Sequence, residues 1–455
     1  MKTGFSSVQW QMLVFAIFAH STVSADEFQD GIEAFNNRDY ETALHVWMPL
    51  AESGDLSAMY NVGLLFDEGL GVEPDKQKAL KWYLPAAEDG DVAAQFNVAI
   101  IYDFGDGVPE DNEKALYWYT AAAQQADEQA QYNLAMMYAA GEGVDVDWER
   151  AINWYKLSAD QGLASAQHNL AQIYDIGAVV PEDNQTAMKW YMKAAEQDDR
   201  DAQYAIALMY DEGDGFIEDN PAAIAWYTRA AMQGHLNAQF NLAIMYDEGE
   251  GVPEDNLSAI KWYTAAAEQG HGSSQLNLGI MYENGEGIDA DYGEAMKWYR
   301  LAADQGLGDA QYAVAIMFDE GKGVPEDNVA AIAWYTMAAE HGDAQAQNNL
   351  GAMYDAGEGI PVDDKEAIKW YRLSADQGNP IAQNNLGAMY YGGEGIRENK
   401  TEAFKWFYIA AALGNTDAGD NRDLAAAGMR KSQISKATRL ADKWLEEYEE
   451  KTSGF

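Results

Sequence analysis

The chain has 455 residues, with 29 basic and 75 acidic side chains and a formal net charge of −46. This excess of carboxylates argues against a nucleic-acid binder or an anionic-membrane binder, because such partners are held by Lys and Arg side chains. The chain contains no cysteine, which excludes disulfides, thiolate metal ligands and a cysteine nucleophile. Hydrophobic residues make up 48% and aromatic residues 12%, so the chain can bury a sizeable core and is not an acidic disordered tail.

Residues 1–25 have the pattern of a secretory signal peptide. Lys2 is followed by an apolar run over 12–19 and then by the small residues Val23, Ser24 and Ala25. The pattern predicts cleavage after Ala25 and a periplasmic or secreted protein, with an uncleaved interfacial anchor as the alternative. The apolar run is shorter than the ~20 residues that a membrane span needs, so we expect no integral membrane segment in the mature chain.

An internal repeat of 36 residues dominates the rest of the sequence. Ten of the 14 tryptophans fall in one register, each followed by a second aromatic residue. The pairs are Trp82-Tyr83, Trp118-Tyr119, Trp154-Tyr155, Trp190-Tyr191, Trp226-Tyr227, Trp262-Tyr263, Trp298-Tyr299, Trp334-Tyr335, Trp370-Tyr371 and Trp406-Phe407. A fixed period of this length predicts a repeat architecture rather than a set of globular domains.

Apolar spacing divides each unit into two helices. Ala94, Val98 and Ile101 recur at i, i+4 and i+7, and Ala115 and Trp118 open a second run with the same helical period. Small alanines allow the two helices to approach closely, and we expect the tryptophan to fill the space between them.

Glycines mark the ends of these helices. Paired glycines follow the first helix at 69/71, 105/107, 141/143, 213/215, 249/251, 285/287, 321/323, 357/359 and 393/395, and single glycines end the second helix at 90, 162, 234, 270, 306, 342, 378 and 414. Such positions suit turns with positive φ. Val179 replaces the second loop glycine of one unit, and Ala126 and Asp198 replace the terminal one of two others. We expect locally altered turns at these three sites.

The unit that runs from Ala238 to Gly270 resembles the Sel1-like repeat, a relative of the tetratricopeptide repeat. Ten such units cover 55–414, between a capping hairpin over 26–54 and capping helices over 415–455. The resemblance implies an all-α, right-handed α-solenoid of about ten 36-residue helix-turn-helix repeats with N- and C-terminal helical caps. It further implies a protein that presents surfaces to other proteins. Solenoids need such terminal caps for solubility.

The same resemblance raises an enzymatic alternative. Some members of the family are described as binding or hydrolysing penicillin, but their repeats are cysteine-bridged and this chain has no cysteine. A cell-wall or β-lactam hydrolase is therefore the alternative function, and our prediction is that the chain is not an enzyme.

Candidate catalytic and metal-ligating residues are repeated rather than singled out. His235 and His271 occupy equivalent positions in adjacent units, roughly a helix-pair spacing of ~10 Å apart, which is too far for both to ligate one zinc ion. The acidic residues recur from unit to unit, so no carboxylate pair has an environment of its own. We predict no catalytic site, no cofactor and no metal site.

The loops between the helices are rich in oxygen ligands. The tetrapeptide Pro-Glu-Asp-Asn recurs at Pro109, Pro181, Pro253 and Pro325, in every second unit. Asp and Asn before a helix cap its free N–H groups and complement its dipole, which is the interpretation we favour. The alternative is weak Ca²⁺ binding, and with it a protein that responds to divalent cations.

The other face of the first helices is the predicted partner-binding groove. Its aromatic and amide positions supply the candidate residues Tyr60, Phe96, Asn97, Tyr132, Asn133, Asn169, Tyr204, Phe240, Asn241 and Tyr312. Residues 57–67 and their equivalents through 381–391 contain no Lys or Arg, and eight of the ten helices carry an acid near the end, as at Asp67 and Asp103. Such a groove favours a basic or amphipathic protein or peptide. The alternative is that the aromatic position packs within the stack.

These observations predict a non-enzymatic interaction scaffold, adaptor or regulator of the bacterial cell envelope. The expected partner is a protein or peptide and not a nucleic acid. The sequence leaves the oligomeric state open.

Overall fold

The computed structural model describes residues 25–452, and this part of the chain consists of helices joined by loops, without strands. Contacts divide it into two units, the first ending at Asp219 and the second beginning at Asn220, each of which is described by itself. The predicted signal peptide covers 1–25, and residues 1–24 lie outside the described part. None of the helices in 25–452 combines the length and apolarity needed to cross a membrane.

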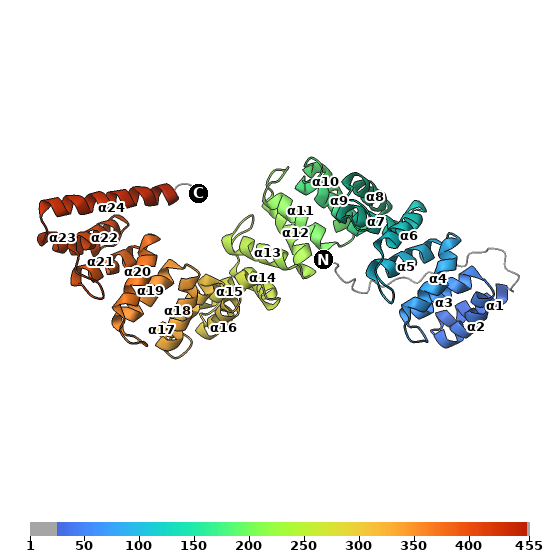
Figure 1. Ribbon diagram of the computed structural model, residues 1–455, viewed down its shortest axis with the longest axis horizontal. Coiled ribbons are helices and arrows are strands. Elements are labelled where there is room, and N and C mark those ends of the chain that lie inside the picture. Colours follow the sequence, from blue (N-terminus) through green and yellow to red (C-terminus); the bar gives the residue numbers. More distant parts are fainter. Residues whose placement is uncertain (1–24, 453–455) are drawn as a thin grey trace. The chain divides into compact units, whose positions relative to one another are not determined.

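The first unit contains α1 to α11 (Figure 1). These helices are α1 (Ala25–Asn36), α2 (Tyr40–Glu52), α3 (Leu56–Glu68), α4 (Lys76–Glu88), α5 (Val92–Phe104), α6 (Asn112–Gln124), α7 (Glu128–Ala140), α8 (Trp148–Gln161), α9 (Ala164–Ile176), α10 (Asn184–Ala195) and α11 (Arg200–Asp211).

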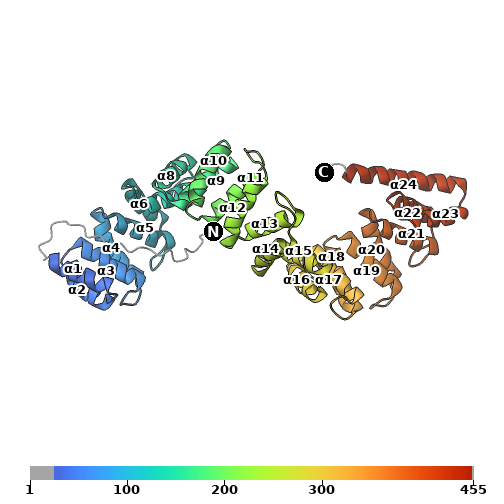
Figure 2. The same cartoon turned by 180° about the vertical axis from the view of Figure 1, so that it is seen from behind.

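The second unit contains α12 to α24, and the view from behind shows the same order of neighbours (Figure 2). Its helices are α12 (Asn220–Met232), α13 (Leu236–Glu248), α14 (Asn256–Glu268), α15 (Gly272–Asn284), α16 (Tyr292–Ala303), α17 (Gly308–Glu320), α18 (Asn328–Glu340), α19 (Ala344–Ala356), α20 (Asp364–Asp376), α21 (Pro380–Gly392), α22 (Lys400–Ala412), α23 (Ala418–Ala427) and α24 (Lys431–Thr452).

Neighbouring helices pack in sequence order within each unit. From α3 to α22 the odd-numbered helices are the first helices of the repeats and the even-numbered ones are the second. In the first unit α5 packs on α6 within one repeat, and α6 packs on α7 of the next. In the second unit α22 also packs on α23 and α24. This nearest-neighbour packing confirms the predicted α-solenoid.

Acidic side chains begin most of the helices, as the sequence predicts for the second helices. Asp111 Oδ1 accepts a hydrogen bond of 3.0 Å from Lys114 N at the start of α6, and Asp91 Oδ1 accepts one of 2.7 Å from Ala94 N at the start of α5. Each bond satisfies an N–H group that the helix leaves free. The Asp residues of the loops therefore have a capping role, which confirms the interpretation that we favoured.

The second glycine of each loop fixes the contact between adjacent repeats. Gly143 has a φ of 70°, and a Cβ added to it would lie 2.5 Å from the carbonyl oxygen of Asn112, the first residue of α6. Glycines at 71, 107, 215, 251, 287, 323, 359 and 395 lie against the start of the preceding repeat's second helix in the same way. Only a residue without a side chain allows this approach of the backbone.

Two of the three predicted turn alterations are wrong. Ala126 has a φ of 68° and Asp198 a φ of 62°, so both keep the left-handed conformation that glycine adopts at the equivalent sites. A Cβ added at the equivalent Gly90 would meet no atom within 4 Å, so a side chain there is free of clashes. Val179, by contrast, does not adopt a positive φ, and its loop differs from the others as expected.

We therefore expect Ala126→Gly to raise the free energy of unfolding by about 1 kcal/mol, because it removes the strain of a left-handed alanine. Urea unfolding followed by circular dichroism would measure the change. Ala121→Gly, in the right-handed interior of α6, is the control and should have the opposite sign. An Ala126→Gly variant that is less stable than the wild type would contradict the assignment of strain.

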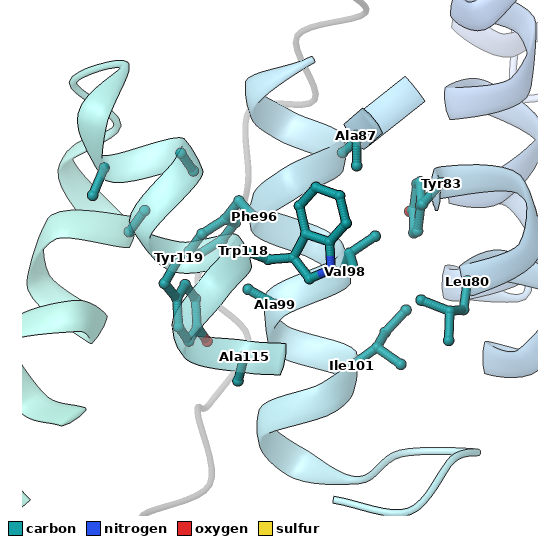
Figure 3. Close-up of a cluster of buried hydrophobic side chains, with 14 of the residues drawn as sticks. Leu80, Tyr83, Ala87, Phe96, Val98, Ala99, Ile101, Ala115, Trp118 and Tyr119 are labelled. Carbon is teal, nitrogen blue, oxygen red and sulfur yellow. The ribbon is translucent and has the colours of Figure 1, made fainter. Parts of the chain in front are cut away.

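In the aromatic pair of each second helix, the second residue is buried more deeply than the tryptophan, which differs from our expectation. The second member fills the space between the helices, since Tyr83 and Tyr119 are completely buried. The tryptophan lies nearer the surface and packs toward the preceding repeat, as Trp82 does on the cluster around Trp47. Figure 3 shows Trp118 beside Val98, and Tyr119 beside Phe96. The tryptophan therefore shares this space with the tyrosine, which is the more deeply buried of the two.

Candidate partner-binding surface

The candidate residues lie on the first helices of both units. Tyr60, Phe96, Asn97, Tyr132, Asn133, Asn169 and Tyr204 belong to the first unit, and Phe240, Asn241 and Tyr312 to the second. Phe96 is buried, whereas the others are half-buried. Within a unit they follow one another at repeat intervals, as the sequence pattern requires.

The aromatic position packs against the second helix of its own repeat. The ring centroids of Tyr60 and Tyr83 are 5.6 Å apart, and those of Phe96 and Tyr119 are 5.9 Å apart. The pairs Tyr132–Tyr155, Phe240–Tyr263 and Tyr312–Tyr335 repeat the arrangement. Contacts also reach the following repeat, because the hydroxyl of Tyr312 donates to Gln345 Oε1 at 3.0 Å. The residues at the aromatic position therefore stabilise the packing of the helices, whether or not they also bind a partner.

The asparagine position donates to a buried tyrosine of the preceding repeat. Asn241 Nδ2 lies 3.1 Å from the Tyr227 hydroxyl, and Asn277 Nδ2 lies 3.0 Å from that of Tyr263. Asn97 and Asn133 bond the hydroxyls of Tyr83 and Tyr119. Asn169 donates to the Tyr132 hydroxyl at 3.3 Å.

The acid at the end of the first helix accepts from the same tyrosine. The Tyr263 hydroxyl donates to Asp247 Oδ2 at 3.2 Å, and the Tyr335 hydroxyl donates to Asp319 Oδ2 at 3.0 Å. Together with the asparagine, each set forms a chain from Asn to Tyr to Asp that spans two repeats. Equivalent tyrosine–acid bonds join Tyr83–Asp67, Tyr119–Asp103, Tyr191–Asp175, Tyr299–Glu283 and Tyr371–Asp355.

Partial burial shifts the pKa values along this chain. Burial raises the pKa of Asp247 and Asp319 above the usual carboxyl value, and the tyrosine hydrogen bond opposes the shift. Burial also raises the pKa of Tyr60 and of Tyr155 to about 12. Because the same environment recurs in repeat after repeat, these shifts mark a structural network and not one reactive group.

Exceptions within the chain support this interpretation. In the tenth repeat Tyr391 stands where most repeats have the acid, and there Phe407 replaces the tyrosine. Trp47 occupies the tyrosine position of the N-terminal helix pair, and the amide of Asn61, 1% exposed, has no hydrogen-bond partner for either polar atom. Where the tyrosine is replaced, the network of hydrogen bonds is thus lost.

An apolar row lies four residues after each aromatic position, except in the fourth repeat, where Gln172 interrupts it. The apolar row consists of Leu64, Ile100, Met136 and Leu208 in the first unit and of Ile244, Ile280 and Ile316 in the second. Met136 and Ile280 are 44% and 39% exposed. Ala352 and Ala388 continue it with smaller side chains.

A ladder of buried glutamines, which sequence analysis missed, joins the repeats near the other end of the first helices. Gln275 Nε2 donates to the carbonyl of Ala267 at 3.0 Å, and Gln305 Nε2 donates to Gln275 Oε1 at 2.8 Å. Gln95, Gln131, Gln167, Gln203, Gln239, Gln311, Gln347 and Gln383 make the same bond to the second helix of the preceding repeat. The recurrence of Gln at 36-residue intervals was the signal that could have revealed them.

Histidines cap two of the first helices. His235 Nδ1 accepts from Ala238 N at 3.1 Å, and His271 Nδ1 accepts from Ser274 N at 3.2 Å. Among residues 25–452 no group of three or more His, Asp or Glu side chains is arranged to hold a metal ion.

We expect the His271 cap to depend on pH. Burial lowers the pKa of His271 below its usual value, so the unfolded chain takes up a proton before the folded chain does. The stability that the cap contributes is therefore complete above about pH 6.5 and declines as the pH falls below it. A nuclear magnetic resonance titration should give His271 a pKa below 6.5, and His271→Asp should remove this pH dependence. A value at or above 6.5 would contradict the prediction.

This geometry defines a class of proteins, the α-solenoids built of helix pairs that contact only their neighbours. The family model described as the Sel1 repeat matches ten consecutive segments of the chain. They are 56–91, 92–127, 128–163, 164–199, 200–235, 236–271, 272–307, 308–343, 344–379 and 380–415. The chain therefore belongs to the Sel1 repeat family. Sel1 repeats are a non-enzymatic fold for protein interactions, and the proteins that contain them are generally interaction scaffolds.

Solved structures agree with this assignment. A protective antigen of uropathogenic Escherichia coli strains, described as displaying an SLR fold, is 32% identical, with a TM-score of 0.65 over 89% of this chain and 95% of that one. A Sel1 repeat protein from Oxalobacter formigenes is 33% identical, with a TM-score of 0.53 over 67% of this chain and 89% of that one. No curated protein shows significant sequence similarity to the chain.

Proposed function

We propose that this protein is a non-enzymatic scaffold or adaptor of the bacterial cell envelope, which binds protein or peptide segments along its first helices. The apolar row is the observation that carries the proposal. It presents side chains as exposed as Met136 and Ile280, and residues 57–67 and their equivalents through 381–391, which contain the row, include no Lys or Arg. Exposed apolar side chains that recur on one face are typical of protein-binding surfaces.

The chemistry of this face favours a basic or amphipathic segment. The acids at the helix ends, such as Asp247 and Asp319, accept hydrogen bonds from tyrosines but retain their negative charge near the surface. An approaching cationic side chain gains from that potential, while its apolar neighbours cover the apolar row.

Location in the envelope rests on two supports. Residues 1–25 have the order of a signal peptide, with a basic residue, an apolar run and small residues. The E. coli relative is a protective antigen, which is consistent with exposure to the outside of the cell. A fusion of residues 1–40 to alkaline phosphatase, which is active only after export, tests this part. Lack of phosphatase activity would refute it.

A capture experiment tests the binding function. The purified chain is immobilised and incubated with envelope extract of its source bacterium at low and at moderate salt, and bound proteins are quantified by mass spectrometry. We expect a specific partner whose recovery falls with salt and is lost with Met136→Asp and Ile280→Asp. Leu257→Asp and Val329→Asp, at exposed positions of second helices, form the matched control. Recovery that is equal for both pairs of variants would refute binding along the first helices.

A further inference from the structure

A second exposed apolar surface lies in the first unit, in the loops of the third and fourth repeats. It consists of Val146, Trp148, Ile176 and Val179, which we call the loop patch. Their exposed fractions are 57%, 37%, 64% and 41%. Trp148 begins α8, and Ile176 ends α9.

Packing brings these side chains to the same edge of the unit. Helices α8 and α9 pack against each other and run in opposite directions, so the beginning of α8 lies at the same end as the end of α9. In the nine loops that keep both glycines, the second glycine lies on the start of the preceding second helix. Val179 and Trp148 occupy these two positions in the tenth loop.

The loop patch departs from the pattern of its own repeats. The position of Val146 is Glu at 110, 182, 218, 254, 326 and 398, and the position of Trp148 is Asn at 112, 184, 220, 256 and 328. Ile176 corresponds to Glu at 68, 212, 248 and 320, and Val179 to glycine in the other nine loops. Single positions are apolar or aromatic elsewhere, at Val362, Tyr292 and Phe104, but only here are all four apolar together, at one place in an acidic loop edge. Isolated exposed apolar residues are ordinary, whereas a group of this kind marks a binding site.

The surroundings of the loop patch are predominantly acidic, although the adjacent Arg150 pairs with Asp147 at 3.3 Å. Residues 141–149 and 175–183 contain no Lys or Arg, and they carry Glu142, Asp145, Asp147, Glu149, Asp175, Glu182 and Asp183. A second copy of this chain, with a net charge of −46, would meet strong repulsion there. A cationic segment would be attracted.

We propose that the loop patch binds a short partner segment in which one or two large apolar side chains are flanked by Lys or Arg. The apolar side chains cover Trp148 and its three neighbours, and the basic side chains face the acids of the two loops. This inference rests on the proposed function in one respect, because it takes the partner to be a protein. It assigns that partner a surface separate from the apolar row.

The test uses the full chain and a library of random 12-residue peptides displayed on phage. Its key variant combines Val146→Glu, Trp148→Asn, Ile176→Glu and Val179→Gly, so that the loop patch receives the residues of the other repeats. Because those residues fold normally elsewhere in this chain, the helical circular dichroism should be unchanged. A second variant, Met136→Asp with Ile280→Asp, alters the apolar row instead.

We expect the wild type to enrich peptides that combine large apolar residues with Lys or Arg. A synthetic peptide from that set should bind the four-residue variant at least tenfold more weakly by fluorescence anisotropy, bind the apolar-row variant unchanged, and lose affinity with added salt. Three results would overturn the proposal. The first is that the wild type enriches no peptides relative to the four-residue variant, and the second is that the synthetic peptide binds the wild type and the four-residue variant with equal affinity. The third is a dimer of the wild type in sedimentation equilibrium that only the four-residue variant abolishes. In that case an envelope partner lost with the apolar-row variant would still uphold the proposed function.

Discussion

Replacement of Gly143 by alanine is expected to lower the free energy of unfolding by about 3 kcal/mol, one of the largest effects of a single methyl group in this chain. Two causes add. Alanine would have to adopt a φ of 70°, and its Cβ would lie 2.5 Å from the carbonyl oxygen of Asn112. That oxygen belongs to the backbone of α6, so relief of the clash requires the loop to move off the neighbouring repeat.

The matched control is Gly162→Ala, at the end of α8. Gly162 also has a positive φ, of 111°, but a Cβ there would meet no atom within 4 Å. This variant isolates the backbone strain and should cost about 1 kcal/mol. Because a repeat array need not unfold in one step, hydrogen exchange of the amides of α6 and α7 is the better measurement. Equal costs for the two variants would show that contact with Asn112 is unimportant.

Tyr335→Phe should lower the free energy of unfolding by about 2 kcal/mol at neutral pH. The hydroxyl of Tyr335 donates to Asp319 Oδ2 at 3.0 Å and accepts from Asn349 Nδ2 at 3.2 Å. Its removal leaves a half-buried carboxylate and an amide without this partner. Hydrogen bonds to charged groups are the ones whose loss costs most.

The sign of the pH dependence follows from Asp319. Burial raises its pKa in the folded chain and the tyrosine bond opposes this, so the pKa should rise further in Tyr335→Phe. A carboxyl with a raised pKa binds protons more tightly when folded, and its contribution to stability declines as the pH rises from acid to neutral. The difference between wild type and variant should therefore be largest near pH 7 and shrink toward pH 4. Urea unfolding at several pH values measures it.

The third repeat supplies a control for this prediction. Ala139 stands there in place of the acid, so Tyr155 has no carboxylate at the equivalent position. Tyr155→Phe should cost about 1 kcal/mol or less and show no pH dependence from such a carboxyl. A Tyr335→Phe cost that does not vary with pH would contradict the role of Asp319.

The sequence could predict the repeat, the helix pairs and the capping Asp residues because each depends on a local pattern of a few residues. The loop glycines could be predicted for the same reason. The left-handed conformation of Ala126 and Asp198 could not be predicted, because whether a turn tolerates a side chain depends on the space around it. The open surroundings of the equivalent Gly90 show that such space exists.

Contacts between repeats could not be predicted from local sequence patterns. Gln275 reaches the carbonyl of Ala267 in the preceding repeat only because consecutive helix pairs stack in one register, and it meets Gln305 of its own repeat 30 residues away. The order of burial in each Trp-Tyr pair also depends on stacking, since both residues are apolar on the same helix. For the candidate site, the asparagines and acids were located correctly on one face. Their hydrogen bonds with buried tyrosines could not be predicted, because those tyrosines are 14 to 16 residues away along the chain.

The glutamine ladder has a direction, and this bears on how such a chain can grow. Each glutamine donates to a carbonyl of the preceding repeat, and in most repeats it accepts from a glutamine at the end of its own repeat, so a unit duplicated in frame carries both halves of the joint with it. Gene duplication can therefore lengthen the array in steps of 36 residues without leaving a buried amide unmatched. At Gln383, whose Oε1 has no partner, Leu413 stands where another glutamine would donate. The series ends there, and a copy inserted beyond this point would not inherit a complete joint.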